Sequence, residues 1–393
     1  MPQYPQTPTP KIKLCYFCSL DSFDTGMPIS TYKLIEHFAN HPDFQVFVVV
    51  PGQGELFRRI RQWGIEPCSI PFGRLRSPKR FRAFIGFIIT YPLSFLRIAS
   101  FLQKNKIALV HFSDIIDAPF YPCARLANAK VVAHLRHCIE NPTARFLFSR
   151  FAALFTHKVI CISKAVHRYS GIIGLRAEVI YNPGPDLTRF DPQKKYTPPP
   201  GLPHNRAIVL SIGKFLRVKG HEHFVRMAHA VERSRPGISH FAIVGSTQPD
   251  REEYYQEVKK LIASLNLESV VTILNHIPYE QIPAVLACSS VFVHAPNWLE
   301  GLGGVVLEAM AMEVPVVAFN SGGVSECFTH ELSGFLVAQF DVAAAATRII
   351  ELLDNTIVRK KMGCHARKEL LSKFSYKNHF SAIESTYRTI FHV

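Results

Sequence analysis

The sequence lacks any uninterrupted run of about twenty apolar residues, the length that an α-helix needs to cross a bilayer. Its most apolar long stretch, residues 80–102, is interrupted by Pro92 and Arg97. The first residues, MPQYPQTPTPK, are proline-rich and polar, without the basic region and apolar core of a secretory signal. We therefore expect a cytoplasmic protein whose first strand follows a short disordered lead-in.

Cysteine pairs are also scarce. Of the nine cysteines, only Cys15 and Cys18 form a Cys-x-x-Cys, and both fall in an apparent strand. Alternation along a strand would place their side chains on opposite faces. No second pair is present to complete a zinc site. The pattern fits a reducing cytoplasm and predicts no metal centre.

Acidic residues are few relative to basic ones, 30 against 45, which gives a formal net charge of +15. Such a charge favours anionic partners: nucleotide diphosphates, anionic lipid headgroups or nucleic acid. Nucleic acid is the weakest of these, because the sequence contains no recognised binding module. The charge is concentrated in residues 58–106, where Arg and Lys are interleaved with Phe, Ile, Leu and Tyr. This basic-aromatic region predicts contact with an anionic membrane surface.

Two structures are compatible with residues 80–102 inside that region. We expect a pair of helices packed on the first sheet. The alternative is an interfacial segment whose basic and aromatic residues bind anionic lipid. The segment can pack on the sheet and also bind lipid if only one of its faces is buried.

At 393 residues the chain exceeds the usual size of one domain, so we expect two. Apolar strands alternate with helical stretches through both halves, which is typical of parallel α/β sheets. The expected strands are 11–17, 45–50, 109–112, 130–134, 158–162, 207–212, 241–245, 270–274, 291–294 and 314–319, and a helix begins near Ser30.

The expected fold is therefore α/β, with two Rossmann-like doubly wound domains facing a central cleft. Residues 1–187 form the first domain, 188–205 a proline-rich linker, 206–373 the second domain, and 374–393 an amphipathic C-terminal helix. Ligands of such sheets bind outside the carboxyl ends of the strands. We therefore expect the cleft to be the active site and the second domain to bind the nucleotide.

The most informative motif places two carboxylates, Glu300 and Glu308, on either side of a glycine-rich turn. The turn consists of Gly301, Leu302, Gly303 and Gly304. At the start of a helix, unpaired backbone N–H groups and the helix dipole favour a phosphate. Glu308 lies one helical turn further, where it would accept hydrogen bonds from ribose hydroxyls, and Glu300 lies beside whatever the diphosphate carries. The alternative is a tight strand–helix junction with a solvated Glu308.

A second motif, SIGKFLRVKG at residues 211–220, follows the first strand of the second half. Gly213 lets the backbone turn close to a ligand, and Lys214 and Lys219 bring positive charge to it. Arg217 would contribute in part. Gly245, at the end of the next strand, is expected to approach the nucleotide. A solvated basic loop is the alternative.

Together these residues resemble the C-terminal signature of retaining glycosyltransferases of family four, which have the GT-B fold. The matching residues, in order, are Glu300, Glu308, Ala309-Met310-Ala311, Pro315-Val316, Gly322-Gly323, Glu326 and Gly334-Phe335-Leu336-Val337. Two positions depart from the pattern. Glu313 replaces a usual Gly, which predicts a modified helix end, and Lys214 replaces a usual Arg, which keeps the charge but not the bidentate geometry.

The resemblance covers most of the chain, densely from about Ile180, and implies roles in the first half. Within Asp24-Thr25-Gly26, Gly26 matches a loop that meets the acceptor or the donor phosphate. His134, at a strand end, matches a histidine near the transferred sugar, and Arg136 lies close by on the acceptor side. His111 matches a weaker position. The C-terminal helix would cross back onto the first domain.

The sequence thus predicts a retaining glycosyltransferase that uses a nucleotide diphosphate sugar, with Glu300, His134 and Lys219 as its catalytic group. The expected acceptor is a glycan or lipid-linked glycan of cell-surface polysaccharide synthesis, at the inner face of the membrane. Because lysines supply the charge, we expect no obligatory metal or cofactor. The alternatives are a GT-B epimerase or phosphorylase, and a non-catalytic nucleotide-sugar-binding protein.

Overall fold

The structure, a computed structural model, describes residues 11–22, 26–73, 81–174, 176–203, 205–247, 252–275 and 277–391. These residues form two compact units. The first contains the chain up to Ile180 together with the residues from Phe380 onward, and the second contains Tyr181 to His379. Asp24, Thr25 and residues 74–80 of the basic-aromatic region lie outside the described residues.

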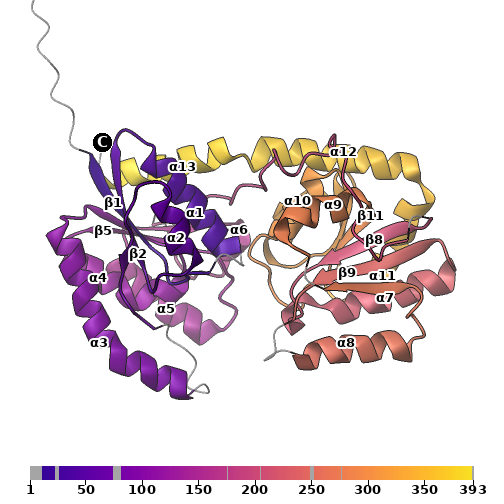
Figure 1. Cartoon of the computed structure of the whole chain (residues 1–393), viewed down its shortest axis with the longest axis horizontal. Coiled ribbons are helices and arrows are strands. Elements are labelled where there is room, and N and C mark those ends of the chain that lie inside the picture. The colour runs from indigo at the N-terminus through magenta and orange to yellow at the C-terminus, as the bar shows by residue number, and fades with distance from the viewer. Residues whose placement is uncertain are drawn as a thin grey trace, which may run out of the picture. The chain divides into compact units, whose positions relative to one another are not determined.

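The first unit is built on a sheet of parallel strands (Figure 1). In sheet order these are β3 (Cys68–Ser69), β2 (Phe44–Val50), β1 (Ile12–Phe17), β4 (Leu109–Phe112), β5 (Lys130–Leu135), β6 (Lys158–Cys161) and β7 (Ala177–Val179). The strand predicted at 109–112 coincides with β4, whereas the short strands β3 and β7 were not predicted. Both cysteines of the Cys-x-x-Cys are buried and free.

Helices cover both faces of this sheet. Residues from α1 (Gly26–Ala39), α2 (Glu55–Arg61) and α13 (Tyr376–Phe391) form one core with alternate residues of β1 and β2. On the other face Phe17 contacts Phe120, and Phe112 contacts Tyr121. That face carries η1 (Ile115–Phe120), α3 (Phe81–Lys104), α4 (Tyr121–Leu126) and α5 (Pro142–Phe155), and α6 (Lys164–Arg168) precedes β7.

The segment expected to be a pair of helices is the single helix α3, which continues through Pro92. Proline lacks the N–H that would bond to the carbonyl of Ile88, four residues earlier. Ile88 is exposed, so water can take the place of that donor. The predicted pair of helices was therefore wrong, and α3 is one helix in which the residue four positions before Pro92 is exposed.

The C-terminal helix α13 begins in the second unit, and its residues from Phe380 onward belong to the first. Ile383 and Tyr387 are fully buried in the core of the first unit. Oγ1 of Thr386 donates to Oε1 of Glu178 at 2.6 Å. The end of the chain thus contributes core residues to the sheet formed by its beginning.

The second unit has its own parallel sheet (Figure 1). Its strands, in sheet order, are β10 (Val271–Asn275), β9 (Ser239–Gly245), β8 (Ala207–Ile212), β11 (Ser289–His294), β12 (Val316–Phe319) and β13 (Gly334–Val337). Its helical segments are η2 (Arg217–Lys219), α7 (His221–Ser234), α8 (Glu252–Ser264), η4 (Tyr279–Gln281), α9 (Ile282–Ala287), α10 (Gly304–Ala311), η5 (Gly322–Glu326), α11 (Val342–Asp354) and α12 (Thr356–Lys373).

Both sheets change strand order at one place, between β1 and β4 in the first unit and between β8 and β11 in the second. Connections leave such neighbours in opposite directions, which opens a crevice at the carboxyl ends of the two strands. The residues after β8 and β11 include Gly213, Lys219 and Glu300. The topology alone therefore brings the two motifs of the second half to the same edge of one sheet.

Candidate active site

The turn after β8 brings the backbone close to that edge. The N–H of Gly213 donates to the carbonyl of Val244 at 2.9 Å, and the N–H of Phe215 donates to Ser246 at 3.0 Å. A Cβ on Gly245 would lie only 2.1 Å from the carbonyl oxygen of Gly213. Glycine at position 245 is thus required by the close approach of two adjacent strand ends.

Lys219 and Glu300 form an ion pair at the centre of the site. Nζ of Lys219 lies 3.1 Å from Oε2 of Glu300. The indole N–H of Trp298 donates to the same oxygen at 3.0 Å, and Nε2 of His294 lies 3.6 Å from it. Lys219 also lies 5.7 Å from the centre of the Trp298 ring. Glu300 is therefore surrounded by nitrogen groups on three other side chains.

This environment keeps Glu300 ionised. Burial would raise the pKa of Glu300, but Lys219 and His294 lower it, and the resulting pKa lies well below the ordinary value. A deprotonated carboxylate accepts hydrogen bonds and has no proton to donate. The site therefore offers a fixed acceptor at Glu300.

Two glycine turns shape the backbone around Glu300. Gly303, with φ +85°, precedes α10, and a Cβ on Gly304 would meet open space. On the other side the N–H of Gly323 donates to the carbonyl of Glu300 at 2.8 Å. Gly322 has φ +57°, and a Cβ there would lie 2.2 Å from the same oxygen. Gly322 and Gly323 thus fix the backbone of Glu300, from which the chain runs through Gly303 into α10.

Glu308, inside α10, forms a hydrogen bond with the phenol of Tyr279 in η4. Burial raises the pKa of Glu308 to about 7, although the Tyr279 hydroxyl opposes that rise. The ring of Tyr279 is held by Arg189, 5.6 Å from the ring centre, and by Phe190 at 5.7 Å. At neutral pH Glu308 is therefore close to the point at which a carboxylate and a carboxylic acid are equally populated.

A network of backbone and side-chain bonds fixes the loop that carries Lys219. Nδ2 of Asn297 donates to the carbonyl of Arg217 and to Oε1 of Glu222, each at 2.6 Å. Gly220 has φ +66°, and a Cβ there would lie 2.0 Å from the carbonyl oxygen of Ala295. The β8–α7 turn and the loop after β11 therefore pack against one another, which sets the distance from Lys219 to Glu300.

The remaining donor-side residues divide into two groups. Lys214 follows Gly213 and is half-buried, and the carbonyl of Leu302 accepts from the thiol of Cys327 at 2.7 Å. Arg217, by contrast, is exposed and forms an ion pair with Glu257 of α8. The structure therefore directs Arg217 toward α8, and the expected partial contribution of its charge to the diphosphate site is not supported.

The predicted residues of the first unit lie at the carboxyl edge of its own sheet. His134 is the fifth residue of β5 and is fully buried, and Arg136 follows the end of that strand. Arg136 donates to the carbonyl of Ser113 at 2.9 Å and to Oγ of Ser30 at 2.8 Å. Gly26 is the first residue of α1, which begins four positions before the predicted start at Ser30. Roles for these residues stay predictions.

Sequence reasoning missed several residues that shape both sites. These are Tyr279, His294, Trp298 and Asn297 in the second unit, and Tyr387 in the first. Tyr279, Asn297 and Tyr387 reach their partners through contacts between elements that no spacing in the chain predicts. The only signal for Trp298 was its place two residues before Glu300.

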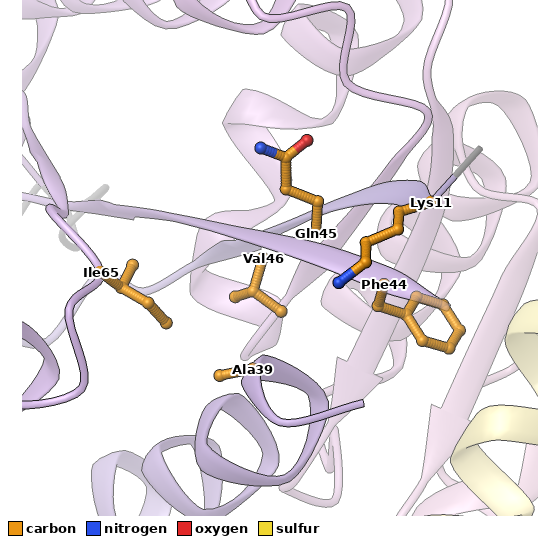
Figure 2. A pocket seen from close by; sticks show the side chains of 6 residues that line it. All are labelled: Lys11, Ala39, Phe44, Gln45, Val46 and Ile65. Atoms are coloured by element: carbon orange, nitrogen blue, oxygen red, sulfur yellow. The ribbon is translucent and has the colours of Figure 1, made fainter. Parts of the chain in front are cut away.

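Other possible sites lie elsewhere. Figure 2 shows a hollow of about 290 Å³ at the start of β2, lined by Lys11, Ala39, Phe44, Gln45, Val46 and Ile65. It lies at the amino end of the strands, whereas His134 and Arg136 of the same unit lie at the carboxyl end. Among the described residues, His41, Asp43 and Glu384 are near enough to one another to hold a cation, but Arg388 already pairs with both carboxylates.

Comparison with known proteins extends over nearly the whole chain. Residues 25–184 match the family described as Glycosyltransferase Family 4, and residues 192–369 match the family described as Glycosyl transferases group 1. The chain is 29% identical over 290 residues to the alpha-D-kanosaminyltransferase of Streptomyces kanamyceticus, which covers 74% of this chain and 69% of that protein.

A second relative is the GDP-mannose-dependent alpha-(1-6)-phosphatidylinositol monomannoside mannosyltransferase of Mycolicibacterium smegmatis. It is 30% identical over 277 residues, 65% of this chain and 69% of the relative. Some other alignments are shorter, and the one with spore coat protein SA of Bacillus subtilis spans 49% of that protein. The crystal structure of Anabaena Alr3699/HepE in complex with UDP and glucose superposes with a TM-score of 0.76 at 19% identity, covering 95% of this chain and 99% of that one.

The two parallel-sheet units and the site at the switch point of the second define a GT-B fold. The chain belongs to family 4 of the glycosyltransferases, and its enzymatic class is that of a hexosyltransferase. The predicted family and fold are thereby confirmed.

Proposed function

We propose that this protein is a retaining glycosyltransferase that moves a sugar from a nucleotide diphosphate sugar to a glycan or lipid-linked glycan. The observation that carries the proposal is the Lys219–Glu300 pair, 3.1 Å apart, with Glu300 on the backbone that runs into α10. The pair offers a cation for a diphosphate and an anion for sugar hydroxyls in one place. The UDP and glucose of the superposable Anabaena protein support a donor of this class.

In the proposed reaction the bond between C1 of the sugar and the diphosphate oxygen breaks, and C1 forms a bond with the acceptor hydroxyl oxygen. Lys219, Lys214 and the N–H groups of Gly303 and Gly304 stabilise the negative charge that develops on the diphosphate. Glu308 binds the ribose and Glu300 orients the sugar. Both donor-side carboxylates are thus assigned to binding the donor, and among the described residues no further side chain is assigned as a nucleophile on its other face. We therefore infer front-side attack, in which the acceptor proton passes to the departing phosphate oxygen.

A panel of nucleotide sugars, read by thermal shift, tests the donor half of the proposal. One nucleotide sugar should raise Tm clearly, and Glu308→Gln should weaken that response. Glu331→Gln, an exposed change outside the site, should leave it intact. If no nucleotide sugar changes Tm, the proposal fails.

The stereochemistry is tested by NMR of the first product formed. The anomeric configuration of the transferred sugar should equal that of the donor, and an inverted product would contradict the mechanism. Incubation with donor alone separates the alternatives, because an epimerase converts the donor without an acceptor. Chelation of divalent ions should leave the rate unchanged if lysines alone offset the charge.

The acceptor side of the proposal rests on helix α3, which is apolar on two opposite faces. One stripe, at Phe87, Ser94, Ile98 and Leu102, is buried against the first unit. The hydroxyl of Tyr91 on that side donates to the carbonyl of Pro119 at 2.6 Å. By length and composition the segment from Ile85 to Lys104 is also apolar enough to cross a membrane, with 28% of its most apolar window buried.

The opposite stripe of α3 faces solvent. Its apolar members follow helical spacing, at Ile85, Ile88, Ile89, Leu93 and Leu96. Ile89 is 71% exposed and Leu96 is 65% exposed. Helix α3 contains no acidic residue and carries exposed Arg82, Arg97 and Lys104. An apolar stripe with only cationic charge around it is complementary to an anionic bilayer surface.

We propose that this exposed stripe inserts into the headgroup region of an anionic membrane, which brings the enzyme to a lipid-linked acceptor. The buried stripe keeps α3 on the protein, so the helix would lie in the membrane surface and not cross it. The Mycolicibacterium relative, whose name includes a phosphatidylinositol acceptor, supports an acceptor of this class. Synthesis of cell-surface polysaccharide at the inner face of the membrane fits both the exposed stripe and a lipid-linked acceptor.

Sedimentation with lipid vesicles tests the membrane proposal. The protein should bind vesicles that contain phosphatidylglycerol and not vesicles of phosphatidylcholine alone. Ile89→Ser combined with Leu96→Ser should abolish binding without lowering Tm, because both side chains are exposed. The matched control is Ile357→Ser, a change of an 81% exposed isoleucine on α12. Equal binding by all variants would contradict the role of α3.

A further inference from the structure

A chain of buried polar side chains runs from α13 to the end of β5 in the first unit. Oη of Tyr387 lies 2.6 Å from Nδ1 of His111, and Nε2 of His111 lies 3.3 Å from Nδ1 of His134. At the ends, Oη of Tyr16 lies 3.2 Å from Oη of Tyr387, and Nη2 of Arg136 lies 3.4 Å from Nδ1 of His134. The two histidines and both tyrosines are fully buried.

The guanidinium at one end sets the direction of the hydrogen bonds. Burial lowers the pKa of Arg136 to about 10, so it stays charged at neutral pH and presents only donors. This long contact favours a bare Nδ1 on His134, with the proton of the neutral imidazole on Nε2, but does not fix that form alone. Nε2–H of His111 donates to the same Nδ1 from the other side, so the two donors share one lone pair, at 3.3 and 3.4 Å.

The remaining bonds follow from this assignment. A neutral imidazole carries one proton, so a His111 that is protonated on Nε2 has a bare Nδ1. A second positive charge beside Arg136 would be unfavourable in this buried position, which keeps both imidazoles neutral. The hydroxyl of Tyr387 therefore donates to Nδ1 of His111 and in turn accepts from the hydroxyl of Tyr16.

We propose that Tyr387 and His111 position His134 by locking its imidazole in the neutral form that carries the proton on Nε2. The proposal rests on the proposed function and on the catalytic role that the family resemblance predicts for His134. In this form the buried Nε2 carries a proton and can only donate, so His134 cannot remove a proton from a substrate. Tyr387 and His111 act through His134 and are positioning residues.

The proposal gives the C-terminal helix a part in the site. Tyr387 belongs to α13 and lies 276 positions from His111 in the sequence. Its ring is also packed between Phe38 and Phe44, with centroid distances of 5.1 and 6.0 Å. This packing leaves the hydroxyl little freedom to find another acceptor. A change that removes only the hydroxyl therefore tests its role without disturbing the core.

The first test is ¹⁵N NMR of the full chain labelled at its histidine imidazoles. Protonated and bare ring nitrogens differ widely in chemical shift, and loss of signals in His134→Gln identifies those of His134. In the wild type, Nε2 of His134 should be protonated and Nδ1 bare. In Tyr387→Phe the signals should move toward a mixture of both forms. A proton on Nδ1 in the wild type, or no change in Tyr387→Phe, would overturn the proposal.

The second test compares Tyr387→Phe with Tyr121→Phe. Tyr121 is equally buried in the same unit, and its hydroxyl has no hydrogen-bond partner among the described residues. Loss of the Tyr387 hydroxyl should lower kcat about fivefold at unchanged KM for the donor, the effect of one buried hydrogen bond. Tyr121→Phe should keep the wild-type kcat, and an equal loss in both variants would overturn the positioning role.

Failure of this proposal is distinguishable from failure of the proposed function. The NMR signals report the protonation of His134 whether or not any sugar is transferred. If no donor or acceptor pair reacts while the Nε2 form is found and responds to Tyr387→Phe, the transferase assignment fails and the locked imidazole stands. If transfer is retained and Nδ1 is protonated, the locked imidazole fails and the transferase assignment stands.

Discussion

The carbonyl oxygen of Glu313 lies so close to Gly363 that a Cβ on residue 363 would be only 1.9 Å away. Glu313 follows the end of α10 and has φ +59°, a left-handed conformation that favours glycine. The expected modification of this helix end is therefore a strained glutamate at a position where relatives usually have glycine. The carbonyl of that residue packs against α12 of the same unit.

Glu313→Gly should stabilise the protein. The left-handed conformation costs a non-glycine residue about 1–2 kcal/mol, and the greater freedom of glycine in the unfolded chain offsets part of this. We expect a net gain of about 0.5–1 kcal/mol in the free energy of unfolding, measured with urea. Asn266→Gly, at φ +53° after α8, is the control and should gain less, because asparagine tolerates this conformation. A loss of stability in Glu313→Gly would contradict the strain.

Gly322→Ala should disturb both stability and donor binding. At φ +57° an alanine is strained, and its Cβ would overlap the carbonyl oxygen of Glu300 at 2.2 Å. We expect a loss of about 3 kcal/mol in the free energy of unfolding and a weaker thermal shift with donor. The control is Gly237→Ala, which has φ +73° but nothing within 4 Å. It should lose only about 1 kcal/mol, and equal losses would show that the contact with Glu300 is unimportant.

Glu300→Gln should separate diphosphate binding from sugar transfer. The change removes the anion that pairs with Lys219, so a nucleoside diphosphate should bind at least as tightly as before, measured by calorimetry. Transfer should fall by about 100-fold or more, because the sugar loses a fixed acceptor. Weaker diphosphate binding together with normal transfer would contradict the assigned roles.

Donor binding should strengthen as pH rises through about 7, where Glu308 loses its proton. The carboxylate accepts hydrogen bonds from both ribose hydroxyls, whereas the carboxylic acid offers less acceptor capacity. The affinity for the donor, measured between pH 5.5 and 8.5, should be nearly independent of pH in Glu308→Gln.

Glu308 also makes the stability of the donor-free protein depend on pH, and this stability falls where donor binding strengthens. The pKa of Glu308 is higher in the folded chain than its ordinary value of 4.5, so the folded state binds the proton more strongly than the unfolded state. Without donor, its contribution to stability is present below pH 4.5 and is lost as pH rises through about 7. Glu308→Gln should remove that loss from the Tm profile. An unchanged profile would indicate that Glu308 titrates at its ordinary pKa.

Local sequence patterns were sufficient to predict most of the fold. The strands predicted at 109–112 and 207–212 have those bounds in the structure, because each is a short apolar run between polar turns. The sequence assigned Lys219 and Glu300 to one site, but their ion pair depends on the strand order, which the sequence did not predict. Glycine at 245 and 322 could be recognised as special, although the atoms that require glycine there could not be named.

Contacts between distant side chains were beyond the sequence patterns. The hydrogen bond of Tyr279 with Glu308 and that of Tyr387 with His111 depend on how helices pack on a sheet, and no spacing in the chain predicts them. The single helix across Pro92 was missed for a different reason. A proline is tolerated when the carbonyl that it leaves unpaired is exposed to water, and exposure is a property of the folded chain.

The exposed stripe of α3 also affects the behaviour of the purified protein. Its exposed Ile88, Ile89 and Leu96 form a row that separate molecules can bury against one another when no lipid is present. Concentrated preparations in plain buffer should therefore self-associate, and a mild detergent should restore single particles in light scattering. Ile89→Ser with Leu96→Ser should be the more soluble protein, which would make it the better form for crystallisation of the donor complex.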